Sequence, residues 1–123
     1  MDAKYGFSQS SWENAKSEMR EILVETAKAG GTLPYSVVVS RTKTIKLEPN
    51  AYALAHMLGE ISTEEDEAGR GMLSVVVVHK HGDMKPGPGF FELAKRLGRD
   101  TSDITKCWIE ELKKVHACWK GVR

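Results

Sequence analysis

Two histidines and an aspartate follow the most apolar run of the chain closely enough to suggest metal chemistry. Residues 75–78 are all valine, and His79, His81 and Asp83 come directly after them. Imidazole and carboxylate groups are zinc ligands, and side chains two residues apart share one side of an extended chain. Metal sites usually need three or four ligands, and the other two histidines lie in separate predicted helices. We therefore expect that the protein binds no metal and no other cofactor. If a metal does bind, these three residues are the candidate ligands.

Glu60, Glu64 and Lys80 carry the groups that a metal-dependent nuclease uses. Two carboxylates can hold Mg²⁺, while a lysine orients water or stabilises charge on the phosphate. Glu60 and Glu64 are four residues apart and share one face of a predicted helix. Many such nucleases carry an acidic residue two positions before the lysine on the same strand. That pattern is absent here, because residue 78, two positions before Lys80, is valine. A nuclease is therefore an alternative to the non-catalytic function that we expect.

Six basic residues are the predicted nucleic-acid contacts. Three of them lie within residues 41–46, and the others flank the apolar run. Lysine and arginine neutralise phosphates regardless of base sequence. The three tryptophans fall on apolar helix faces and are expected in the core, so aromatic interleaving is poor. The main expectation is a small non-catalytic nucleic-acid-binding protein whose phosphate contacts are Arg41, Lys43, Lys46, Arg70, Lys80 and Lys85.

Residues 60–67 form the acidic pole of the chain, with five carboxylates among eight residues. A polarised surface can orient a charged partner. This segment predicts a third possibility, a protein-interaction module such as a phage or defence-system regulator whose acidic face meets a basic partner. A solvated charged face is the plainer interpretation of the same residues.

The loop over residues 85–89 reads Lys-Pro-Gly-Pro-Gly. Its prolines lack an amide donor and its glycines favour turns, so the loop ends any strand before it. Free amides at the start of the next helix could bind phosphate. Since the Gly-Lys-Ser/Thr of a P-loop is absent, a turn is the preferred interpretation.

Hydrophobic spacing supplies the elements that would position these groups. Ser10 and Glu13 fit a capping box at the start of the first helix, and Pro49 suits the first turn of the second. Helices are predicted over residues 10–29, 49–66, 90–97 and 103–119.

The valine-rich run from residue 72 is predicted to be a central strand, because its apolar residues do not alternate with polar ones. Residues 32–47 fit either a strand or a short helix from residue 35 to 41. The order of elements predicts a helix-rich α+β domain with a sheet of two or three strands. Residues 1–9 are expected to be a flexible N-terminus.

Composition is that of one globular domain of 123 residues, with 41% hydrophobic and 28% charged side chains and a net charge of +1. Its apolar runs are far shorter than the ~20 residues that span a membrane. The N-terminus does not read as a signal peptide. Cys107 and Cys118 would lie ~16 Å apart on one helix, too far to bond. These features predict a cytoplasmic protein with reduced thiols and no membrane association.

Several segments resemble small prokaryotic and phage-associated proteins of unassigned function. The resemblance covers about residues 20–119 and implies a prokaryotic or phage origin, with no activity attached. It is carried by Leu58-Gly59-Glu60-Ile61, by residues 69–77, by Lys80 and by residues 86–94.

The order of helices, apolar strand and glycine-rich loop, with Gly31-Thr32-Leu33-Pro34-Tyr35, is similar to the winged-helix domain of alkylguanine-DNA alkyltransferases and alkyltransferase-like proteins. That resemblance implies a winged-helix-like fold and DNA binding. The family's Pro-Cys-His-Arg motif, or the Trp variant, is replaced here by Met72-Leu73-Ser74-Val75. Alkyl transfer is therefore not expected, and fold analogy alone is a limited warrant for function.

Overall fold

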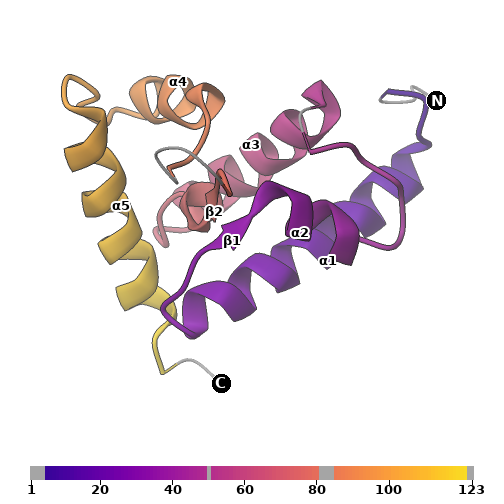
Figure 1. Ribbon diagram of the computed structural model, residues 1–123, viewed down its shortest axis with the longest axis horizontal. Coiled ribbons are helices and arrows are strands. Elements are labelled where there is room, and N and C mark those ends of the chain that lie inside the picture. Colours follow the sequence, from indigo (N-terminus) through magenta and orange to yellow (C-terminus); the bar gives the residue numbers. More distant parts are fainter. Residues whose placement is uncertain (1–4, 50, 81–84, 122–123) are drawn as a thin grey trace.

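Helices dominate the part of the chain that the computed structural model describes, residues 5–49, 51–80 and 85–121 (Figure 1). A two-stranded parallel sheet pairs Leu33 with Val77 and Pro34 with Val78. The predicted helix-rich α+β class is confirmed. The elements are α1 (Gln9–Lys28), β1 (Leu33–Pro34), α2 (Tyr35–Arg41), α3 (Tyr52–Glu67), the 3₁₀ helix η1 (Leu73–Val76), β2 (Val77–Val78), α4 (Pro88–Arg96) and α5 (Ile104–Trp119).

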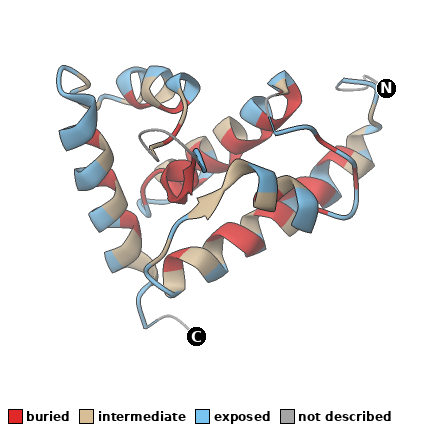
Figure 2. Cartoon of the chain, in the orientation of Figure 1, coloured by how far each residue is buried: buried red, intermediate tan, exposed pale blue. Residues whose placement is uncertain are grey.

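The short segment η1 lies at the centre of the domain and contacts α1, α3 and α5. Figure 1 shows α5 at one end of the molecule and α4 over α3. Buried residues concentrate on η1 and on the inward sides of α1 and α3 (Figure 2). The largest side chains of this core are Trp12, Met19, Leu23, Leu54, Met57, Ile61, Met72 and Leu73.

The prediction of a central strand is wrong about the conformation of this segment but correct about its burial. Residues 71–78 are all buried, yet residues 73–76 form a 3₁₀ turn and only Val77 and Val78 are strand. Side chains satisfy two backbone donors here: Met72 N donates to Glu111 Oε2 at 2.9 Å, and Ser74 N donates to Ser62 Oγ at 2.9 Å. Because these amides have side-chain acceptors, the segment needs no longer strand partner.

The ambiguous segment after the first helix contains both predicted forms. Leu33 and Pro34 pair as β1, and the three valines that follow lie in α2. Pro34 has φ −65° and ψ 149°, an extended conformation that suits the residue before a helix. Burial of Val38 against the core outweighs the strand preference of the valines.

Several helix ends differ from the prediction. The hydroxyl of Ser8, rather than that of Ser10, caps α1 by accepting from Ser11 N at 3.1 Å. Pro49 lies before α3, whose N-cap is Ala51. Pro88 occupies the first turn of α4, and the carboxylate of Asp103 caps α5. Such shifts arise because local sequence allows neighbouring caps and tertiary packing selects one.

The faces of the last helix are only partly as predicted. Val115 is buried, but Ile104, expected on the apolar face, is 46% exposed, and Trp108 and Trp119 are half-buried. The buried positions include Cys107, which, like Cys118, is a free thiol. None of the described helices combines the length and apolar character needed to cross a bilayer.

Tyr5, at the start of the described chain, already contacts the domain. Its ring stacks on Trp12 with centroids 5.8 Å apart, and its hydroxyl lies 3.1 Å from His56 Nδ1. Tyr5 also has φ 54°, which is uncommon for a residue with a side chain. Within the segment expected to be flexible, Tyr5 therefore contacts residues of α1 and α3.

Candidate functional site

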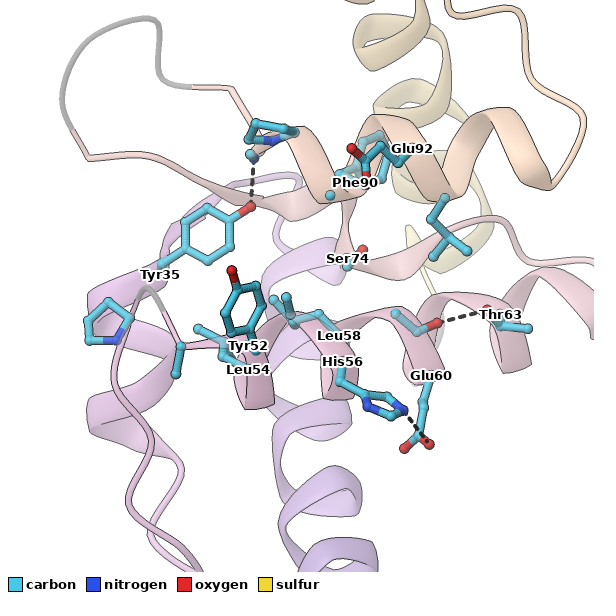
Figure 3. Close-up of a pocket in the computed structure, with 18 of the residues that line it drawn as sticks. Tyr35, Tyr52, Leu54, His56, Leu58, Glu60, Thr63, Ser74, Phe90 and Glu92 are labelled. Carbon is cyan, nitrogen blue, oxygen red and sulfur yellow. Dashed lines mark hydrogen bonds and ion pairs between the residues drawn. The ribbon is translucent and has the colours of Figure 1, made fainter. Parts of the chain in front are cut away.

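A groove with a volume of about 1190 Å³ runs between α3 and α4 (Figure 3). Residues 51–64 form one wall, residues 87–96 form the other, and Tyr35 and Ser36 of α2 line one end. Ligand sites are typically concave and mainly apolar with a few polar groups. Leu54, Leu58 and Phe90 supply the apolar part of this lining.

Aromatic side chains cluster at the α2 end of the groove. Tyr52, in the first turn of α3, is 86% exposed, and its ring rises into the groove on the side of Tyr35 (Figure 3). The ring of His79 packs edge-on against Tyr35, with centroids 5.3 Å apart. The groove thus has one well-supported aromatic corner and one exposed aromatic ring.

The contact of Tyr35 with the start of α4 fixes this corner. Gly87 N donates to the Tyr35 hydroxyl at 2.8 Å. Burial raises the pKa of Tyr35 against the opposing effect of that amide, so the phenol stays neutral at physiological pH. A Cβ on Gly87 would lie 3.2 Å from His79 Nε2. The close approach of the chain here therefore favours glycine.

Ser74 lines the groove from the buried segment η1 (Figure 3). Its hydroxyl oxygen accepts from Ser62 Oγ at 2.6 Å, and its amide donates to the same Ser62 oxygen. The hydroxyl hydrogen of Ser74 is not used in these two bonds. Tyr35 and Ser74 are thus polar groups that hydrogen bonds hold in place among the apolar lining.

The predicted nuclease residues Glu60, Glu64 and Lys80 do line the same groove. Each carboxylate, however, already binds α1. Glu60 accepts from Trp12 Nε1 at 2.7 Å, and Glu64 accepts from Lys16 Nζ at 2.8 Å and also pairs with Arg20. Burial alone would raise the pKa of Glu64, but the bonds from Lys16 and Arg20 outweigh it and lower that pKa. These acids are therefore neutralised within the fold.

The rest of the acidic segment is also paired internally. Arg70 donates to both oxygens of Glu65 at 2.7 and 2.8 Å. Asp66 accepts from Arg99 at 2.6 Å, and this bond lowers the pKa of Asp66. Of the five acids in residues 60–67, only Glu67 forms no ion pair with the described residues. The acidic pole is thus mostly ion-paired within the fold.

Arg99 connects three parts of the structure. It donates to Glu111 Oε1 and Oε2, each at 2.9 Å, and to Asp66. Glu111 is 5% exposed and also accepts from Met72 N. These hydrogen bonds raise the pKa of Arg99, so the guanidinium stays charged. The network joins α5 to α3 and η1.

The candidate metal ligands are not assembled into a site by the described residues. His79 is exposed and packs on Tyr35, while His81 and Asp83 lie outside the described residues. Within residues 5–49, 51–80 and 85–121, no three histidine, cysteine or acidic side chains are grouped to hold a metal ion.

The six predicted phosphate contacts lie in separate places. Arg70 is committed to Glu65 and lies over the Trp119 ring at 5.6 Å, and Lys85 Nζ donates to Thr105 at 2.6 Å. The four others have exposed side chains that form no ion pair with the described part of the chain. Lys80 lies on the groove, Arg41 ends α2, and Lys43 and Lys46 lie in the α2–α3 connection.

The groove contains residues that sequence reasoning missed. The basic clusters and the tryptophans of the sequence do not point to Tyr35, Tyr52 or Arg96, which come from three different helices. One signal was present for Tyr52. It lies off the apolar face marked by Leu54 and Ile61, so the helix periodicity alone predicts an exposed aromatic ring.

Comparison of the chain with protein-family models, with curated proteins and with solved structures finds no match. The resemblances to phage-associated proteins and to winged-helix domains therefore stay predictions. What this chain binds has to be argued from its own groove and charges.

Proposed function

We propose that this protein is a non-catalytic nucleic-acid-binding domain of a prokaryote or phage. The observation that carries the proposal is the difference between the charges that form ion pairs and those that do not. Six carboxylates share four cations in the α1–α3–α5 contacts, while four of the predicted cations remain exposed outside ion pairs with the described residues.

The residues outside these ion pairs are together more basic than the net charge of +1 suggests. The paired carboxylates are Glu13, Glu60, Glu64, Glu65, Asp66 and Glu111, and their cations are Lys16, Arg20, Arg70 and Arg99. Since this paired set is net negative, the remaining residues of the chain are net positive beyond +1. A positive surface attracts a polyanion through counterion release.

The connection between α2 and α3 leads into the groove. Pro49 and Ala51, at the end of the α2–α3 connection, line the groove, and Lys80 and Arg96 lie on its walls. The connection also carries Lys43 and Lys46. Phosphates of one bound strand would run from this connection along the groove.

A binding role is favoured over a nuclease by the internal pairing of Glu60 and Glu64. Metal binding there would have to displace the ammonium group of Lys16, which is buried and close to both acids. Burial opposes the charge of Lys16, but Glu64 and Glu60 more than compensate and raise its pKa. The two free thiols suit the reducing cytoplasm, where we propose that the protein acts.

Reversal of two exposed charges should weaken binding. We expect Lys43→Glu with Lys46→Glu to lower the affinity for a labelled oligonucleotide at low salt by at least about tenfold, because two phosphate contacts become repulsive. Fluorescence anisotropy at several salt concentrations measures this loss. The wild-type affinity should fall as salt rises.

The matched control is Lys113→Glu with Lys120→Glu, which makes the same change of net charge at two exposed positions, one in α5 and one directly after it. Its affinity should fall much less than that of the first variant. Equal losses would show that only net charge matters, and no binding at low salt would reject the proposed function.

A further inference from the structure

We infer that the α3–α4 groove selects single-stranded nucleic acid, with the ring of Tyr52 as the platform on which one base stacks. This inference rests on the proposed function and names the substrate class of the same site. In a duplex the faces of the bases are covered by their neighbours, whereas an unpaired base offers a free face. The residues that line the groove favour a single strand over a duplex for three reasons.

Exposure of Tyr52 is the first support. An aromatic side chain buries a large apolar area when it is covered, yet Tyr52 is 86% exposed at the start of α3. Its ring stands in the groove opposite the wall made by α4 (Figure 3). An exposed ring in a concave, mainly apolar site is a stacking surface that any base can use.

Preorganisation of the neighbouring corner is the second support. Tyr35 is held by the Gly87 amide, and His79 packs edge-on against it. A base on Tyr52 would find this corner already formed, so little side-chain ordering is needed on binding. The groove volume of about 1190 Å³ exceeds the ~300–1,000 Å³ of small-ligand sites, which leaves room for adjoining nucleotides.

Charge on the walls is the third support. Lys80, which follows His79 of the aromatic corner, and Arg96, at the C-terminal end of α4, are exposed in the groove lining and match the phosphates of a bound strand. Glu60 and Glu64 are compensated by α1. Glu92 is the exposed carboxylate of the α4 wall, and it should repel a phosphate. Glu92→Gln is therefore expected to tighten binding of a single strand, the opposite of its effect on a basic peptide.

The test compares a labelled oligodeoxythymidylate of about 12 nucleotides with the duplex that it forms with its complement. By anisotropy at low salt, the single strand should bind about tenfold more tightly than the duplex. Tyr52→Ala should weaken single-strand binding about tenfold, whereas Tyr52→Phe, which keeps the ring, should bind like the wild type. Tyr52→Leu keeps apolar area without a π face and should resemble Tyr52→Ala.

Each alternative outcome has a distinct meaning. Equal binding of both forms, or unchanged binding by Tyr52→Ala, would overturn this inference and leave the proposed function standing. Retained affinity in Tyr52→Leu would replace stacking by apolar contact and also overturn it. Failure of every oligonucleotide to bind would remove the proposed function with it. Because Tyr52 is so exposed, circular dichroism should show each variant folded.

Discussion

Replacement of Arg99 by methionine is expected to lower the free energy of unfolding by about 3–5 kcal/mol, because it leaves a buried carboxylate without its partner. Glu111 is 5% exposed and receives two hydrogen bonds from Arg99, and Asp66 receives a third. Methionine fills much of the side-chain volume but supplies no donor. Urea denaturation followed by circular dichroism measures the loss.

Two further variants make this prediction specific. Lys113→Met removes an exposed cation from the same region and should change stability by no more than about 0.5 kcal/mol. Adding Glu111→Gln to Arg99→Met should recover part of the loss, since the amide can still accept from Met72 N without a buried charge. A loss no larger than that of Lys113→Met would contradict the assigned role of the network.

Gly71→Ala should destabilise the protein by about 2–5 kcal/mol. Its φ of 87° costs a residue with a side chain about 1–2 kcal/mol, and crowding adds about 1–3 kcal/mol. A Cβ at Gly71 would lie 3.0 Å from Glu111 Oε2 and 3.2 Å from Val115 Cγ2. The new methyl group would therefore push α5 and the carboxylate that binds Met72.

Gly69 provides the matched control for this substitution. Its φ is 82°, but a Cβ there would meet no atom within 4 Å. Gly69→Ala should therefore show the backbone cost alone, about 1–2 kcal/mol. The difference between the two alanine variants in urea denaturation measures the crowding against α5. Identical losses would show that this close approach has no energetic importance.

Helix positions could be predicted well from the sequence because one apolar face repeats over many turns. The first helix, with Trp12, Met19 and Leu23 inward, is confirmed as α1. Its cap is Ser8 and not the predicted Ser10, because the two serines have the same capping chemistry and local sequence does not decide between them.

The valine-rich run shows where local preference fails. Its burial followed from composition, but its conformation depended on Glu111 and Ser62, which come from α5 and α3 and accept the amides of Met72 and Ser74. No local pattern reveals such long-range acceptors. Tertiary context therefore converted most of a predicted strand into a 3₁₀ turn.

Ion pairs at the candidate site could not be predicted from local sequence either. Residues 60–67 read as a solvent-facing acidic segment, because Lys16, Arg20 and Arg99 lie far away in the sequence. Folding brings these cations to Glu64, Glu65 and Asp66. The sequence could reveal the number of charges, but not which of them cancel within the structure.

Amide NMR of the isotope-labelled protein, titrated with a single-stranded oligonucleotide, tests the central claim most directly. We predict shifts concentrated in residues 52–64 and 87–96, at Lys80 and in the connection around Lys43, with small shifts along the exposed side of α5. The same titration of Tyr52→Ala should give weaker shifts over the groove. Shifts confined to α5, or no shifts at low salt, would contradict nucleic-acid binding in the α3–α4 groove.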